Sequence, residues 1–187
     1  MNESYAPIEN WERADHFAYY EEKIKSGFTM SGRVDVSNLL EMKRKYCYRM
    51  SSMLYYVITK AINQPENMNF RIFKKGEELF SFNEMQTSFT VFHEDDKTFT
   101  DLWAEYSSNI AWYCQEVEMI KAFYGSKKGV HGRSERPKNC VPISIIPWFE
   151  YDTFCTDTYA ESTNYFPIIT VGKINELDKK VSVLYVS

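Results

Sequence analysis

The chain has 187 residues, the length of a single domain, and its 44% hydrophobic and 17% aromatic residues can build a substantial core. A formal net charge of −4 and a pI near 5.5 argue against a nucleic-acid-binding protein, which usually presents a basic face. Seven glycines and six prolines are too few for a linker-rich or disordered chain.

The cysteines and the amino-terminal segment predict a cellular compartment. Cys47, Cys114, Cys140 and Cys155 show neither CxxC spacing nor paired histidine ligands, so we expect four free thiols and no metal site. Met1–Glu12 is polar and acidic and lacks the apolar core of a signal peptide, and no run of 18 apolar residues occurs. We therefore expect a cytoplasmic protein with neither membrane nor nucleic-acid partners.

The first third of the chain predicts three helices and one strand. Trp11–Lys23 has the pattern of a short helix, Thr29–Val36 alternates as a strand does, and a second helix is expected to begin near Asn38. The clearest pattern is an apolar stripe at i, i+3, i+4 and i+7 spacing over 50–62, which predicts a helix that Pro65 ends.

Strands dominate the expectations for the remainder. Asn69–Lys74 and Glu77–Phe82 predict a β-hairpin, and Phe89–His93 predicts a further strand. Thr98 or Thr100 is expected to cap a long helix whose apolar residues, in chain order, are Phe99, Leu102, Trp103, Tyr106, Ile110, Tyr113, Val117 and Ile120. The last three predicted strands are Cys140–Ile146, Phe166–Ile174 and Val181–Val186.

These elements follow no regular βαβ rhythm, and neither GxGxxG nor GxxxxGK[ST] occurs. We therefore predict an α+β fold over residues 1–187, a two-layer α/β sandwich in which helices cover one face of a mixed β-sheet. The three histidines, His16, His93 and His131, carry no recognisable catalytic spacing, and each is explained as easily by a structural or solvated role.

Five ordered segments resemble the chloramphenicol O-acetyltransferase family at matching intervals. Trp11-Glu-Arg-Ala-Asp-His-Phe17 resembles the WxRxxHF opening, and Asn69-Phe-Arg-Ile72 is similar to the EFRM segment. The other three are Phe89-Thr-Val-Phe-His93 with the residues that follow it, Ile143-Ser-Ile-Ile-Pro-Trp148, and Tyr165-Phe-Pro-Ile-Ile-Thr-Val-Gly-Lys173. Each segment is weak alone, but the ordered set spans nearly the whole chain.

The resemblance implies a homotrimer of α/β sandwiches with active sites between subunits, transferring acetyl from acetyl-CoA to the 3-hydroxyl of chloramphenicol. It implies no tightly bound cofactor, since acetyl-CoA is a cosubstrate. Ser144 matches the serine that donates to the tetrahedral oxyanion, and Thr170 matches a threonine that holds the intermediate through a water. The remaining matches are Arg13, which pairs with a catalytic-motif aspartate; Tyr19, Tyr20, Phe92 and Phe99 in the substrate pocket; and Trp148 and Lys173 near CoA.

One family feature does not occur in the chain, the HHxxxDG motif that supplies the histidine base and the aspartate partner of Arg13. The strand over 180–187 stands where that motif would follow, so we expect a truncated member with negligible acetyltransferase activity that binds chloramphenicol and acetyl-CoA weakly. Two alternatives stay open: an active acetyltransferase that uses His16 or His93 as base, and a non-enzymatic ligand-binding protein.

Overall fold

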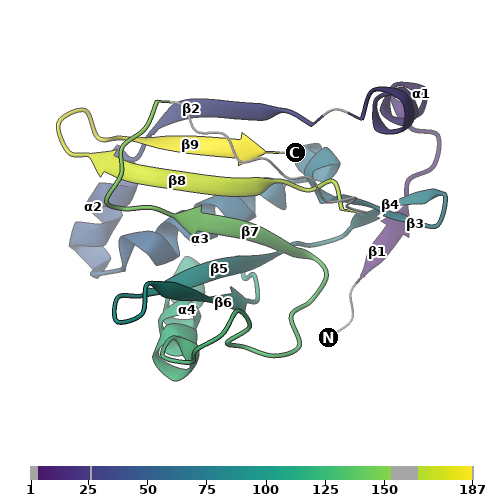
Figure 1. Ribbon diagram of the computed structural model, residues 1–187. Coiled ribbons are helices and arrows are strands. Elements are labelled where there is room, and N and C mark those ends of the chain that lie inside the picture. Colours follow the sequence, from purple (N-terminus) through teal and green to yellow (C-terminus); the bar gives the residue numbers. More distant parts are fainter. Residues whose placement is uncertain (1–3, 26, 153–163, 187) are drawn as a thin grey trace.

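The computed structural model describes residues 4–25, 27–152 and 164–186, and it has two layers, a β-sheet and a set of helices behind it (Figure 1). The main sheet has the order β2-β9-β8-β7-β5-β6. Its strands are β2 (Thr29–Asp35), β5 (Gln86–His93), β6 (Thr98–Ala104), β7 (Cys140–Ile145), β8 (Ile168–Asn175) and β9 (Lys180–Val186). Because β5–β7 and β7–β8 pair in parallel and the other pairs are antiparallel, the predicted mixed sheet is confirmed.

Three helices cover one face of this sheet: α2 (Ser37–Tyr46), α3 (Met50–Ile62) and α4 (Ile110–Tyr124) (Figure 1). The helix α3 has the bounds that its apolar stripe predicts, and the ring of Tyr55 stacks on Phe89 of β5 at 4.9 Å between centroids. Within that stripe only Ala61 is exposed. Across the described part of the chain, no helix is both long enough and apolar enough to cross a membrane.

A smaller sheet lies beside the end of the main one and consists of β1 (Tyr5–Pro7), β4 (Glu78–Phe82) and β3 (Ile72–Lys75). The pair β3–β4 is the predicted hairpin, although its first strand begins later than expected because the 3₁₀ helix η2 (Pro65–Arg71) precedes it. The first predicted helix is present as α1 (Ala14–Ala18), continued by the π-helix η1 (Tyr19–Ile24).

The prediction of a long helix that starts at Thr98 or Thr100 is wrong for its first part. Residues 98–104 form β6, antiparallel to β5, with Phe99 opposite Phe92 and Leu102 opposite Phe89. The helix α4 begins only at Ile110, where the side chain of Asn109 accepts hydrogen bonds from the backbone N–H groups of Ala111 and Trp112 at 3.0 and 3.2 Å. These bonds satisfy two of the donors that a helix leaves free at its start.

Strand alternation divides the main sheet into a helix-covered face and an open face. Ile143 and Ile145 of β7 and Ile169 and Val171 of β8 pack in the core under the helices. Side chains one residue away along a strand point to the opposite face. Ser144, Thr170 and their even-numbered neighbours therefore lie on the open face.

Candidate active site

Two hydroxyl side chains meet on the open face. The strands β7 and β8 are parallel, and their register places Ser144 directly beside Thr170. Neighbouring strands are about 4.8 Å apart, so the two hydroxyls project side by side. Thr170 is buried, whereas Ser144 is partly exposed and accessible to a ligand from the solvent side.

Tyr151 covers the sheet next to this pair and is only 5% exposed. Its hydroxyl donates to the backbone carbonyl of Thr170 at 2.7 Å and is 3.3 Å from that of Ser182. Burial raises the pKa of Tyr151, so the hydroxyl keeps its proton at neutral pH. The ring lies over Gly172, where an added Cβ would come within 2.9 Å of the Tyr151 Cε1 atom. The sequence patterns did not single out Tyr151.

A group of exposed aromatic side chains lies near the carboxyl ends of β5 and β7. Phe92 faces Phe99 across the β5–β6 pair, and its ring is 5.9 Å from the ring of Trp148. All three are solvent-exposed, with Trp148 at 65%. Lys173 reaches the same region through its backbone, because its N–H donates to the carbonyl of Phe149 at 2.8 Å. Trp148 and Lys173, both predicted to approach CoA, thus belong to adjoining segments of one surface.

The helical segment that carries the predicted residues Arg13, Tyr19 and Tyr20 is held beside Tyr165, which precedes β8. Glu21 of η1 accepts from Lys74 Nζ at 3.1 Å and from the Tyr165 hydroxyl at 2.9 Å, and the ring of Phe17 contacts Tyr165 at 4.8 Å. The hydrogen bond from Lys74 is the main reason why the pKa of Glu21 is lowered. Through Tyr165, the segment that leads into β8 is thereby linked to η1.

Arg13, Tyr19 and Tyr20 are all exposed on this segment, and the two tyrosine rings contact each other at 5.5 Å. Within the described residues Arg13 makes no ion pair. The structure therefore places Ser144 beside Thr170, and Phe92 near Phe99 and Trp148. Arg13, Tyr19 and Tyr20 lie on a separate segment of the same chain.

The histidines lie away from the hydroxyl pair or face another way. His93 ends β5 and is buried, and alternation from Phe89 and Val91, both in the core, puts its side chain on the helix-covered face. His16 is exposed on α1, and His131 is exposed in the loop beside β6, where its backbone forms an isolated parallel β-bridge with Asp101. Strand geometry thus separates His93 from Ser144 by the thickness of the sheet.

Cys47 is exposed, whereas Cys114 and Cys140 are buried, and all three are free thiols. Burial raises the pKa of Cys114 to about 11 and that of Cys140 to about 12, so both stay protonated at neutral pH. Cys155 lies outside the described residues.

A family model described as chloramphenicol acetyltransferase matches residues 1–187. The chain belongs to the chloramphenicol acetyltransferase family. The chloramphenicol acetyltransferase 3 of Escherichia coli is 30% identical over 177 residues, which cover 94% of this chain and 82% of that protein. A chloramphenicol acetyltransferase of Clostridium butyricum is 30% identical over 184 residues, covering 97% of this chain and 82% of the relative.

Solved structures agree on the fold. A chloramphenicol acetyltransferase superposes with a TM-score of 0.78 at 13% identity, over 98% of this chain and 88% of the other. The dihydrolipoamide acetyltransferase of Azotobacter vinelandii superposes with a TM-score of 0.65 at 13% identity, over 97% and 81%. The chloramphenicol acetyltransferase family fold is therefore the two-layer sandwich seen here, while the roles of its individual side chains in this chain stay predictions.

Proposed function

We propose that this chain provides the acyl-transfer scaffold of a chloramphenicol acetyltransferase, with chloramphenicol as acceptor and acetyl-CoA as donor. The observation that carries the proposal is the in-register pair of Ser144 and Thr170 on the open face of the sheet. The family resemblance gives both hydroxyls a role in the same intermediate, and their placement on neighbouring strands is compatible with that shared role. Phe92, Phe99 and Trp148 supply an exposed aromatic surface near the ends of adjacent strands.

The reaction requires a proton acceptor and an oxyanion donor. A base removes the proton of the acceptor hydroxyl, whose oxygen attacks the thioester carbonyl carbon and forms a tetrahedral oxyanion. Collapse of this intermediate breaks the carbon–sulfur bond and releases CoA, which takes up a proton. Ser144 donates a hydrogen bond to the oxyanion, a contribution worth roughly 10²–10³ in rate, and Thr170 supports it through a water.

We further propose that these 187 residues on their own bind the substrates weakly and turn over negligibly. The support is the placement of His93 on the opposite face of the sheet and of His131 in the loop beside β6. A general base contributes about 10²–10⁴ in rate, which Ser144 as a donor cannot replace.

The test is chemical rescue, in which free imidazole stands in for a side-chain base. We expect the protein to consume acetyl-CoA slowly in the presence of chloramphenicol, and imidazole to raise this rate in a saturable manner. Ser144→Ala should remove the imidazole-dependent rate, because the oxyanion donor is lost. Acetyl-CoA consumption should be followed through the thioester itself, since exposed Cys47 reacts with thiol reagents.

The alternatives give different outcomes in the same assay. Rapid turnover without imidazole that disappears in His16→Ala would show that this chain recruits His16 as base and would overturn the proposal of negligible turnover. Titration calorimetry without any heat from chloramphenicol or acetyl-CoA would point to a binding protein for another ligand. His93→Ala should leave the rescued rate within about twofold, provided that urea unfolding shows a folded variant.

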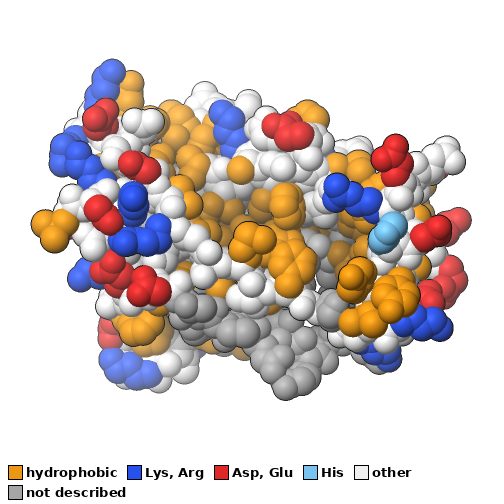
Figure 2. All heavy atoms as spheres, turned by 90° about the horizontal axis from the view of Figure 1, so that it is seen from above, with side chains coloured by type: hydrophobic (Ala, Val, Ile, Leu, Met, Phe, Trp, Pro, Cys, Tyr) orange, Lys and Arg blue, Asp and Glu red, His pale blue; other side chains and the backbone are white. Residues whose placement is uncertain are grey.

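We also propose that the protein assembles as a homotrimer, as the family resemblance implies. The support is the sheet edge at β2, where Phe28, directly before the strand, is 56% exposed and Met30 of the strand is 62% exposed. Figure 2 looks onto this edge and shows hydrophobic side chains gathered across its middle, with charged side chains at either end. Exposed apolar edges of this kind favour association. Light scattering coupled to size-exclusion chromatography tests the mass, and a monomer at micromolar concentration would contradict the proposal.

A further inference from the structure

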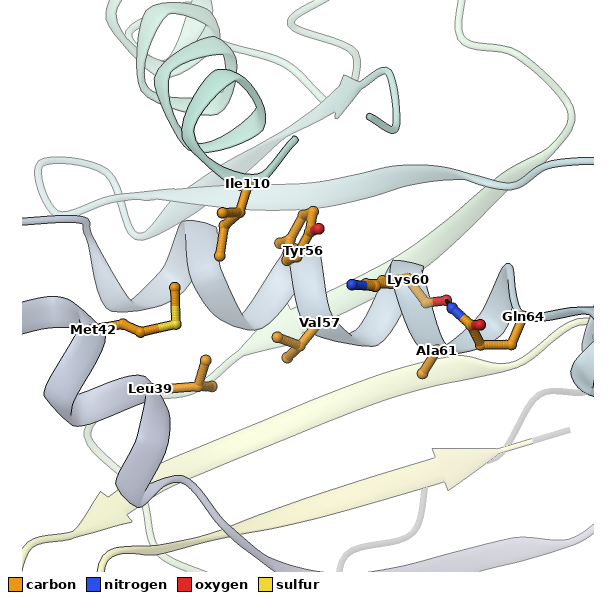
Figure 3. A pocket seen from close by; sticks show the side chains of 8 residues that line it. All are labelled: Leu39, Met42, Tyr56, Val57, Lys60, Ala61, Gln64 and Ile110. Atoms are coloured by element: carbon orange, nitrogen blue, oxygen red, sulfur yellow. Dashed lines mark hydrogen bonds between the residues drawn. The ribbon is translucent and has the colours of Figure 1, made fainter. Parts of the chain in front are cut away.

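A hollow lies in the helical layer, on the opposite side of the sheet from Ser144. It has a volume of about 460 Å³ and is bounded by α2, α3 and the first turn of α4 (Figure 3). Small-molecule pockets commonly have volumes of about 300–1,000 Å³. The size of this hollow is thus that of a ligand site, and acetyl transfer on the open face makes no use of it.

The lining is apolar except at one rim. Figure 3 shows Leu39 and Met42 of α2 reaching toward Val57 of α3 and Ile110 of α4. Contact with these side chains favours an apolar ligand body, because its transfer from water is favourable. The hydroxyl of Tyr56, which also lines the hollow, already donates to the carbonyl of Ser108 at 2.8 Å.

Lys60 supplies a positive charge at the rim. Its ammonium lies over the ring of Tyr56 at 5.6 Å and, within the described residues, forms no ion pair with a carboxylate. Of the eight lining residues Lys60 alone is charged, and none is acidic. The amino-terminal end of α4, where Ile110 lines the hollow, adds the positive end of a helix dipole.

We propose that this hollow, the α2–α3 pocket, binds a small amphiphile that has an apolar chain and a single carboxylate, such as a medium-chain fatty acid. The chain packs between Leu39, Met42, Val57 and Ile110, and the carboxylate pairs with Lys60. The proposal rests on charge complementarity, since the one charged residue in the lining, Lys60, is positive and none of the lining residues is acidic. It is independent of the acetyl-transfer proposal, because the two regions lie on opposite faces of the sheet.

Titration calorimetry with octanoate tests the proposal, with octan-1-ol as a neutral probe of equal chain length. Octanoate should bind with a stoichiometry of one and a dissociation constant below about 1 mM. Octan-1-ol should bind several-fold more weakly. Lys60→Gln should weaken octanoate binding about three- to fivefold and leave octan-1-ol unchanged, because it removes only the charge contact.

Two further variants serve as controls. Lys127→Gln should leave octanoate binding unchanged, since Lys127 also lies over a tyrosine ring, that of Tyr124 at 4.6 Å, but does not line the α2–α3 pocket. Ala61→Trp should block both probes, because Ala61 is an exposed lining residue and a large side chain there fills the space. Urea unfolding checks that each variant is folded.

Three results would overturn the inference. The first is octanoate binding whose affinity is the same in the parent protein as in Lys60→Gln or Ala61→Trp. The others are the absence of saturable heat up to several millimolar octanoate, and an affinity for octan-1-ol equal to that for octanoate. Binding measurements with vesicles that contain an anionic phospholipid distinguish a free small-molecule ligand from a membrane surface as the partner of the pocket. Lys60-dependent binding to such vesicles, without binding of octanoate, would replace the proposed small molecule by a lipid surface.

Discussion

The Tyr151 hydroxyl donates a 2.7 Å hydrogen bond to the backbone carbonyl of Thr170, so a side chain from the segment after β7 holds the strand that carries the predicted catalytic threonine. The same hydroxyl is 3.3 Å from the carbonyl of Ser182 on β9. One buried phenol thereby links β8 and β9 on the open face, beside the position where acetyl transfer is proposed.

Tyr151→Phe should lower the free energy of unfolding by about 1–3 kcal/mol, because the Thr170 carbonyl loses a donor in a buried place. Urea denaturation measures the change. Tyr19→Phe is the matched control: Tyr19 is exposed, so the same substitution should cost less than about 0.5 kcal/mol. Equal effects of the two substitutions would show that the Tyr151 hydroxyl does not stabilise the sheet.

Gly172→Ala should destabilise the protein by about 1–3 kcal/mol. The new methyl group would come within 2.9 Å of the Tyr151 ring and 3.2 Å of the Phe149 carbonyl, so the covering segment would have to shift. Gly32→Ala on β2 is the comparison, since a methyl group there meets nothing within 4 Å. Thermal unfolding that ranks Gly32→Ala as the more damaging change would contradict the described packing of Tyr151.

Asn109→Ala should lower the free energy of unfolding by about 1 kcal/mol, because α4 loses the side chain that caps its Ala111 and Trp112 N–H groups. Asn109→Asp should be neutral or slightly stabilising, since a carboxylate caps equally well and favours the positive helix end. Asn38→Ala replaces an exposed asparagine inside α2 and is expected to change the stability little. Chemical denaturation of the three variants provides the ranking.

Glu21 should make the stability depend on acidic pH. Its pKa is lowered from 4.5 by the hydrogen bonds from Lys74 and Tyr165, so the folded state favours the ionised carboxylate. This contribution is present above pH 4.5 and is lost as the pH falls through the lowered pKa. Glu21→Gln should therefore be less stable than the parent at pH 7, and the two stabilities should converge toward pH 3. Denaturant titrations over this range would refute the contribution if the difference stayed constant.

Trp148→Ala should weaken acetyl-CoA binding about three- to tenfold and affect chloramphenicol less, if Trp148 approaches CoA as proposed. The control is Trp112→Ala, which removes an exposed indole from α4 on the other side of the sheet. Calorimetry with each ligand separates the effects. Equal losses in the two variants would indicate a general effect of removing surface tryptophans.

The helical layer was predictable where periodicity was unambiguous. The stripe from Met50 to Ile62 has one period throughout, and α3 has those bounds. The segment after Thr98 misled the prediction because Phe99, Leu102, Trp103 and Tyr106 also fit a helical spacing. In the structure, β-branched Thr98 and Thr100 alternate with Phe99 and Asp101 along β6, and pairing with β5 decides the conformation.

The candidate site was predictable only in part. The family resemblance singled out Ser144 and Thr170, but their adjacency depends on the register of two strands separated by a long segment, which local patterns do not encode. Tyr151 had no comparable signature, since its importance arises from hydrogen bonds to the backbone carbonyls of two distant strands. The separation of Arg13 from the hydroxyl pair likewise depends on how η1 is tied to Lys74 and Tyr165.

The antiparallel pairing of β2 with β9 has a consequence for biosynthesis. Thr29 pairs with Val186 and Asp35 with Lys180, so an early strand of the chain finds its partner only when a late strand has left the ribosome. At translation speeds of about 5–20 residues per second, β2 waits on the order of ten seconds with its hydrogen-bonding groups unpaired. The main sheet is therefore completed only after β9 has emerged, and until then nascent-chain chaperones have a defined segment, 28–34, whose Phe28, Met30 and Val34 they can shield.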